Sequence, residues 1–239
     1  MALDESKDRV RPISWWRQVW LVLRKDLAIE IATGEVVTTS GFFALLVVVI
    51  ASLSFYAGPT AQAEVAPGVI WVSVAFASVL ALSRTWHRER EHDALSGLLV
   101  LPVERSAIFA GKALGVLAFT LAIEALVVPA TALLFDLPLV RGRLAFGLVA
   151  FSLVATPGIA AAGTLFGAMT VRTSARDLVL AVVLFPLLAP TLLAAVAGTR
   201  ELCAGVPLVE LTDYVVLMSV FGVVFVTGGL GLFGALIDS

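Results

Sequence analysis

Cysteine and histidine are nearly absent from this chain of 239 residues, and charged side chains are scarce. The single cysteine, Cys203, excludes an intrachain disulfide and a cysteine-rich metal site. The two histidines, His87 and His92, are five residues apart, so on a helix they point about 140° away from each other and are poorly placed to share a metal ion. We therefore expect no metal site and no disulfide framework.

Three motifs of nucleotide and hydrolytic chemistry are also missing. Without G-x-x-x-x-G-K-[ST] the chain lacks the loop that cradles ATP phosphates. Without H-E-x-x-H or G-x-S-x-G it lacks the signatures of zinc proteases and of serine hydrolases. The net charge of −2 gives no indication of a nucleic-acid partner. We expect a protein that is not an enzyme and that binds no cofactor directly.

Apolar residues dominate what is present. Hydrophobic residues make up 60% of the chain and charged residues 14%, against about 45–50% and about 25% in soluble domains. A bilayer core needs about 20 helical residues, and continuously apolar runs favour helices over the alternating strands of a β-barrel. The sequence predicts an all-α polytopic membrane protein with six spans, at residues 40–57, 67–83, 107–134, 144–170, 178–197 and 214–237.

The distribution of lysine and arginine predicts the orientation of these spans. All of them except Arg141, Arg143 and Arg200 lie before the first span, between the second and third spans or between the fourth and fifth, with Lys112 just inside the third. Because cytoplasmic loops are rich in lysine and arginine, we expect the N-terminus and the C-terminus to be cytoplasmic.

The region before the first span divides into two parts. Residues 1–13 form a charged tail that we expect to be disordered, and residues 14–39 are predicted to be an amphipathic helix in the membrane interface. Tryptophan beside cations is typical of a helix that lies in the headgroup plane. A plain cytoplasmic lead-in to the first span is the alternative. The apolar stripe consists of Trp16, Val19, Trp20, Leu23, Leu27 and Ile31.

Residues 84–106 form the longest predicted cytoplasmic segment, a charged run followed by leucines. We predict a short amphipathic helix beneath the membrane that docks a cytoplasmic partner. Charge complementarity would set its register, and a few buried leucines would supply most of the binding energy. A solvated connector is the alternative. The docking candidates are Arg84, Arg88, Arg90, Glu91, Leu95, Leu98 and Leu99.

Glu124 is the one charge predicted to lie deep within a span, midway along residues 107–134. An ionisable group at that depth is costly and is a functional candidate by default. The alternative is a hydrogen-bonded contact between helices. Prolines interrupt three spans at Pro129, Pro157, Pro186 and Pro190, where they form either kinks or the broken helices of transporters. Gly158, Gly163 and Gly167 are spaced for close helix packing.

Several short segments resemble one family. They are Ala-Pro-Gly-Val-Ile-Trp-Val at residues 66–72, Leu-Ala-Leu-Ser-Arg at 80–84, Leu-Leu-Val-Leu-Pro at 98–102, and Lys-Ala-Leu-Gly at 112–115. Thr-Pro-Gly at 156–158 and Leu-Phe-Pro-Leu-Leu-Ala-Pro at 184–190 add to them. With these segments the chain, over roughly residues 20–237, is similar to the haem exporter protein B family (CcmB), permeases of bacterial cytochrome c maturation. The motif positions are Pro67, Gly68, Trp71, Pro102, Pro157, Pro186 and Pro190.

The resemblance implies six helices of the ABC-2 exporter type led by an elbow helix, in the bacterial inner membrane. It implies a cytoplasmic ABC ATPase that binds the ATP, a haem-handling membrane subunit with a small accessory subunit, and a periplasmic haem chaperone. A homodimer within such a complex is expected. The subunit would couple ATP hydrolysis to haem delivery or to release of the loaded chaperone, without binding haem itself.

Two other interpretations are open at this stage. An ABC-2 permease that exports another substrate, such as a drug or a glycan, would share the architecture, although residues 66–72 argue against it. An intramembrane enzyme that uses Glu124 lacks a partnered base, a nucleophile or a metal site.

Overall fold

The computed structural model describes residues 13–55, 58–91, 97, 102–137, 142–169 and 176–238, which fold into helices without a strand. Six of the helices are long and apolar enough to cross a membrane, so the prediction of an all-α, six-span membrane protein is confirmed. The helices are α1 (Trp15–Thr33), α2 (Glu35–Ser54), α3 (Pro59–Glu91), α5 (Arg105–Leu134), α6 (Gly142–Met169), α7 (Arg176–Cys203) and α8 (Thr212–Asp238), with a 3-10 turn at Leu208–Leu211.

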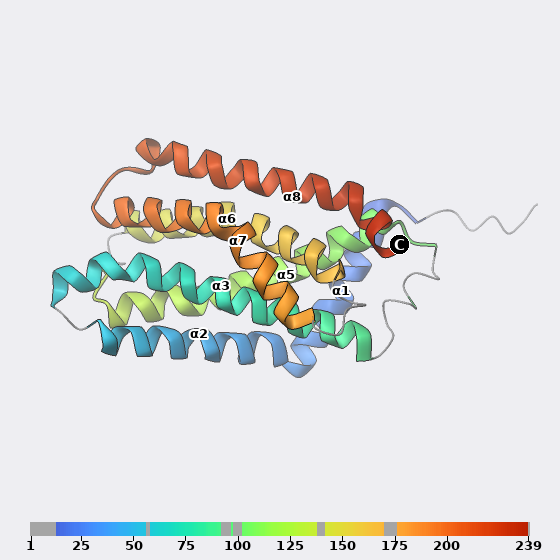
Figure 1. Cartoon of the computed structure of the whole chain (residues 1–239), viewed down its shortest axis with the longest axis horizontal. Coiled ribbons are helices and arrows are strands. Elements are labelled where there is room, and N and C mark those ends of the chain that lie inside the picture. The colour runs from blue at the N-terminus through green and yellow to red at the C-terminus, as the bar shows by residue number, and fades with distance from the viewer. Residues whose placement is uncertain are drawn as a thin grey trace, which may run out of the picture.

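The six long helices run side by side, and α1 crosses one end of the bundle (Figure 1). The C-terminal end of α8 lies at that same end. In the bundle, α2 packs on α3 and α5, α6 packs on α7 and α8, and α1 packs mainly on α5. The shorter first helix therefore lies across one end of the bundle and not among the six long helices. We call this end of the bundle the α1 end.

A glycine separates α1 from α2. Gly34 has a φ of 62°, a left-handed conformation that glycine adopts at little cost and that commonly ends helices. Its amide donates to the Glu30 carbonyl at 2.6 Å, and α2 begins one residue later. The predicted boundary after residue 39 is therefore wrong: the first helix ends at Thr33, and residues 35–39 belong to the first span.

The helix of the second span is longer than its apolar run. It starts at Pro59, where a missing amide costs no hydrogen bond, and Pro67 lies inside it rather than at its start. At the other end the helix continues through Arg84 to Glu91. The prediction that residues 84–91 belong to a separate loop helix is wrong, because helical hydrogen bonding continues past the point where hydropathy falls.

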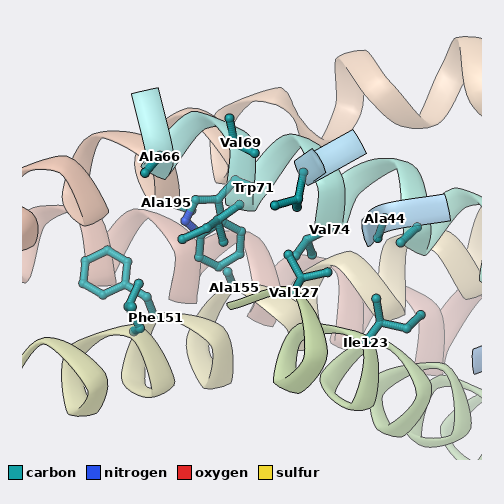
Figure 2. Packing of buried hydrophobic residues seen from close by; sticks show 14 of the residues in the cluster. Ala44, Ala66, Val69, Trp71, Val74, Ile123, Val127, Phe151, Ala155 and Ala195 are labelled. Atoms are coloured by element: carbon teal, nitrogen blue, oxygen red, sulfur yellow. The ribbon is translucent and has the colours of Figure 1, made fainter. Parts of the chain in front are cut away.

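A large apolar core is formed by side chains of several of the long helices, and Trp71 lies near the centre of the part shown in Figure 2. The Trp71 ring is 2% exposed, and its indole N–H donates to the Thr199 hydroxyl on α7 at 2.9 Å. Phe151 from α6 packs in the same core, against Gly198 of α7. One aromatic side chain from the second span thus fixes α3 against α7, both by packing and by a hydrogen bond.

Small residues allow α6 to approach its neighbours closely. Gly158 faces Gly222 of α8, Gly163 faces Leu82 of α3, and Gly167 faces Trp86 of α3. The predicted packing role of these α6 glycines is confirmed. The four predicted proline breaks all lie inside continuous helices, and α7, which contains Pro186 and Pro190, bends part-way along its length (Figure 1).

The contact between Gly158 and Gly222 gives a test of the α6–α8 packing. A methyl group added at Gly158 would lie 3.1 Å from the Gly222 Cα atom, whereas one added at Gly222 meets its nearest backbone atom at 3.7 Å. We expect Gly158→Ala to lower the free energy of unfolding by about 1–3 kcal/mol, as overpacking does, and Gly222→Ala to change it by under about 0.5 kcal/mol. Thermal unfolding in one detergent compares the two variants; equal melting temperatures would contradict this packing.

Candidate functional site

The inner face of α1 carries charge as well as apolar groups. Val19, Val22, Asp26 and Glu30 are all buried and recur every three or four residues, which places them on one stripe of the helix. Gly111 of α5 lies against this stripe, and a methyl group there would lie 2.6 Å from the Val22 Cβ atom. The close approach brings the acidic residues of α1 over the second and third spans.

Four charges from three helices meet beneath α1. The Lys112 ammonium of α5 contacts Asp26 Oδ2 at 3.2 Å and Glu89 Oε1 at 2.7 Å. Lys25 Nζ contacts the same Glu89 oxygen at 2.6 Å and Asp26 Oδ1 at 3.2 Å. Trp86 covers the group, with its ring centroid 5.6 Å from Lys112 Nζ. Two ammonium groups and two carboxylates thus form a closed, electrically balanced set.

A second set of four charges lies where α1 turns into α2. The Arg88 guanidinium of α3 contacts Glu30 Oε2 at 3.2 Å and Glu35 Oε2 at 3.1 Å, and it also donates to the Thr33 hydroxyl at 3.1 Å. Arg84 contacts Glu35 Oε1 at 3.1 Å near the surface. We call the two sets together the ion cluster: Lys25, Asp26, Glu30, Glu35, Arg84, Arg88, Glu89 and Lys112.

Glu30 has a further role at the helix turn. Its carboxylate accepts hydrogen bonds from the amides of Val36 at 3.2 Å and Val37 at 2.8 Å. The first amides of a helix have no partner within the helix, and a carboxylate is favoured there by the helix dipole. Glu30 therefore caps α2 while it holds Arg88, so the angle between α1 and α2 depends on the same side chain as the link to α3.

Neutral hydrogen bonds continue this attachment to the start of α5. The Trp15 indole N–H donates to the Ser106 hydroxyl at 2.9 Å, and the Glu104 amide donates to the Gln18 side-chain oxygen at 2.8 Å. Together with the ion cluster, these bonds fasten α1 to the end of α3 and to the start of α5. Those are the two ends of the segment that the sequence analysis names as a docking element.

Burial makes the set of charges around Lys112 sensitive to the loss of one member. The side chains of Lys112 and Glu89 are 1% and 5% exposed, so neither charge has bulk water to stabilise it. Burial lowers the pKa of Lys25, but the neighbouring carboxylates of Asp26 and Glu89 raise it more, so that its pKa lies above the ordinary value. Removing one partner of such a pair leaves a buried charge uncompensated, which typically costs about 3–5 kcal/mol.

The chain is similar to known proteins over most of its length. The family model described as CcmB protein matches residues 17–232. The chain belongs to the CcmB family. It is 30% identical to heme exporter protein B of Paracoccus denitrificans over 77% of this chain and 83% of that protein. It is 29% identical to heme exporter protein B of Rhodobacter capsulatus over 80% of this chain and 88% of that protein.

The match to the Escherichia coli K12 relative, also named heme exporter protein B, is shorter. It is 29% identical and covers 39% of this chain and 42% of the relative's length. The matches to the Paracoccus and Rhodobacter proteins cover more of the chain, and the family model extends from α1 into α8.

Only some of the predicted docking residues of this CcmB-family chain lie within the described part of the structure, and two of them belong to the ion cluster. Arg84 and Arg88 point to α1 and α2 as members of the ion cluster, with the Arg88 side chain only 17% exposed. Arg90 and Glu91 belong to the last turn of α3. Leu95, Leu98 and Leu99 lie outside the described residues, so the docking prediction now rests on those leucines and on sequence alone.

The family-motif positions lie in different parts of the structure. Trp71 ties α3 to α7, Pro67 is buried inside α3, and Gly68 has open space around its Cα atom. Pro102 is exposed in the bend before α5, Pro157 lies beside Gly158 in α6, and Pro186 and Pro190 lie in α7. These positions shape the bundle and do not gather at one site.

Glu124 lies apart from the ion cluster, on the face of α5 that meets α6. It is 3% exposed, and the Thr156 hydroxyl donates to its Oε1 atom at 2.6 Å. The predicted contact between helices is therefore present.

The ion cluster is absent from the sequence predictions. Of the apolar stripe predicted for this helix, Trp16, Trp20 and Ile31 are 75%, 56% and 86% exposed, whereas Val19 is buried on the inner face. Asp26 and Glu30, which lie on the buried stripe, are not among the predicted site residues. The available signal was the spacing of Asp26 and Glu30, four residues apart, together with a lysine inside a predicted span.

The two parts of the cluster predict different costs of losing one cation. Lys112→Met leaves one ammonium for two buried carboxylates, so we expect a loss of about 3–5 kcal/mol. Arg84→Met is a matched control, since it also replaces a cation by an unbranched apolar side chain. Its pair with Glu35 is 45% and 43% exposed, and exposed pairs contribute about 0–1 kcal/mol. Melting temperatures in one detergent measure both; equal, small losses would contradict a buried cluster.

Proposed function

We propose that the chain is the membrane permease subunit of an ABC complex that serves haem export in cytochrome c maturation. Membership of the CcmB family over residues 17–232 and the names of its relatives support the haem-related task. The bacterial inner membrane, with both termini in the cytoplasm, is the proposed location, supported by the distribution of lysine and arginine. The chain itself is a transport subunit and not a catalytic one.

The observation that carries a mechanical role is the attachment of α1 to both ends of the segment at residues 92–104. On α3, Glu89 contacts α1 just before the segment. On α5, Ser106 and Lys112 contact α1 just after it. A protein that pushes on the segment would therefore move α1, α3 and α5 together. Because contacts of fixed geometry transmit displacement better than solvated loops, this arrangement suits a subunit that receives work from outside.

The source of that work is proposed to be a separate cytoplasmic ATPase. The sequence has no P-loop, so ATP hydrolysis would reach the spans through a protein contact. The leucines at 95, 98 and 99 are the proposed anchors of the ATPase, and a haem-handling membrane subunit, a small accessory subunit and a periplasmic haem chaperone are the other proposed partners. A homodimer within the complex is proposed as well.

Two substitutions separate docking from transmission. With the tagged chain expressed in cells together with its operon partners, Leu98→Asp should lose the ATPase on pull-down, because a buried apolar anchor becomes charged. Lys25→Met lies in the ion cluster and outside the proposed docking surface. It should keep the ATPase on pull-down and lower the level of mature cytochrome c at least about threefold.

The control is Arg143→Met, an exposed arginine outside both the ion cluster and the predicted docking residues, and it should leave both readouts close to the unchanged chain. If Leu98→Asp keeps full ATPase association and full cytochrome c maturation, the segment is a connector and the coupling proposal fails. If the purified complex contains an ABC ATPase while cytochrome c levels stay normal in cells that lack this chain, the exporter serves another substrate and the haem-related task is wrong.

A further inference from the structure

A groove of about 420 Å³ opens between α5 and α6. Pockets for small molecules fall in the range of about 300–1,000 Å³ and combine apolar walls with few polar groups, and this groove has that character. Of the nine lining side chains other than Glu124, only Ser152 is polar, through its hydroxyl. The lining residues are Leu121, Glu124, Ala125, Val128, Pro129, Ala145, Leu148, Val149, Ser152 and Leu153.

Glu124 gives the groove an unused polar contact. Its Oε1 atom accepts the Thr156 hydroxyl at 2.6 Å, whereas its Oε2 atom is buried and has no hydrogen-bond partner among the described residues. Ser152 stands on the opposing helix, and its hydroxyl interacts with the Glu124 carboxylate, yet the Oε2 atom itself has no hydrogen-bond partner among the described residues. Ionisable groups within membranes usually pair with an opposite charge or a polar group, so Oε2 is the position where a partner is missing.

Depth and size restrict the partner. Glu124 lies ten residues before the end of α5, or about 15 Å along the helix axis, which is too deep for the headgroup of a lipid in the adjacent leaflet. The groove extends along about 12 Å of each helix at about 1.5 Å per residue. A transmembrane helix is about 10–12 Å wide with its side chains. A groove of about 420 Å³ is too small to hold such a helix, so it suits a compact molecule better.

We propose that this groove binds a compact lipophilic amine. The ammonium group would donate to Glu124 Oε2 and supply the positive charge that a carboxylate needs away from water. The hydrocarbon body would lie against Leu121, Val128 and Leu153. Neither haem nor an ATPase is part of this site, so it stands or falls independently of the proposed export function.

Photolabelling of the purified full chain in lipid nanodiscs tests the site. The probe is a medium-length alkyl chain that carries a diazirine and ends in a primary amine, and its matched control is the same chain ended by a methyl group. Peptides that contain residues 121–129 and 145–153 should be labelled about tenfold more by the amine than by the control. Glu124→Gln, which keeps the shape of the side chain, should remove about that tenfold advantage.

A second variant guards against loss of folding as an explanation. Ala145→Phe fills the groove from α6 without touching Glu124, and it should abolish labelling by both probes while the protein stays monodisperse. Equal labelling by amine and control, or amine labelling that survives both substitutions, would overturn the proposal. In membranes that contain the whole complex, a cross-link from residues 145–153 to another chain with no amine labelling would overturn it in favour of a partner helix.

Discussion

The pairing of Lys112 with Asp26 and Glu89 is the interaction on which the α1 end of the bundle depends. Without it α1 would be held to α5 only by packing against Gly111 and by neutral hydrogen bonds, and its ion pairs would reach α3 alone. With it, a lysine near the start of the third span is neutralised by one carboxylate from α1 and one from the second span. The bundle therefore tolerates a buried charge there only while all three helices are in position.

The same electrostatic constraint organises the neighbouring turn. Glu30 satisfies the first amides of α2 and binds Arg88 at the same time, and Gly34 lets the chain reverse within one residue. Each of these contacts is local, yet each joins a different pair of helices. Buried ion pairs need not add stability relative to apolar packing, so their effect here is to specify one arrangement of α1, α2, α3 and α5.

The fold followed from the sequence because hydropathy reports directly on membrane helices. Six apolar runs, of which only the third contains charged residues, Lys112 and Glu124, correspond to six helices. The helix ends could not be predicted in this way: α3 begins at Pro59 and continues to Glu91 because helical hydrogen bonding does not stop where the bilayer core does. The packing glycines of α6 were predictable, since close approach needs small residues in any helix pair.

The candidate site was less predictable, and the reason is physical. A charged residue near a membrane surface has the same sequence signature whether it is solvated or buried in an ion pair. Arg84 and Arg88 looked like docking residues, and only the arrangement of three helices shows that they face Glu30 and Glu35. Glu124 stood out because hydrocarbon is an environment in which any charge is unusual.

The central claim is that the ion cluster makes α1 one unit with the end of α3 and the start of α5. Hydrogen exchange of the purified chain with Glu89→Gln tests it, because this change keeps the side-chain shape and removes the charge that both lysines contact. The account predicts that backbone amides of Trp15–Thr33 and of the first turns of α5 exchange at least about tenfold faster, with α6 and α8 unchanged. Faster exchange confined to the end of α3, with α1 as protected as before, would contradict it.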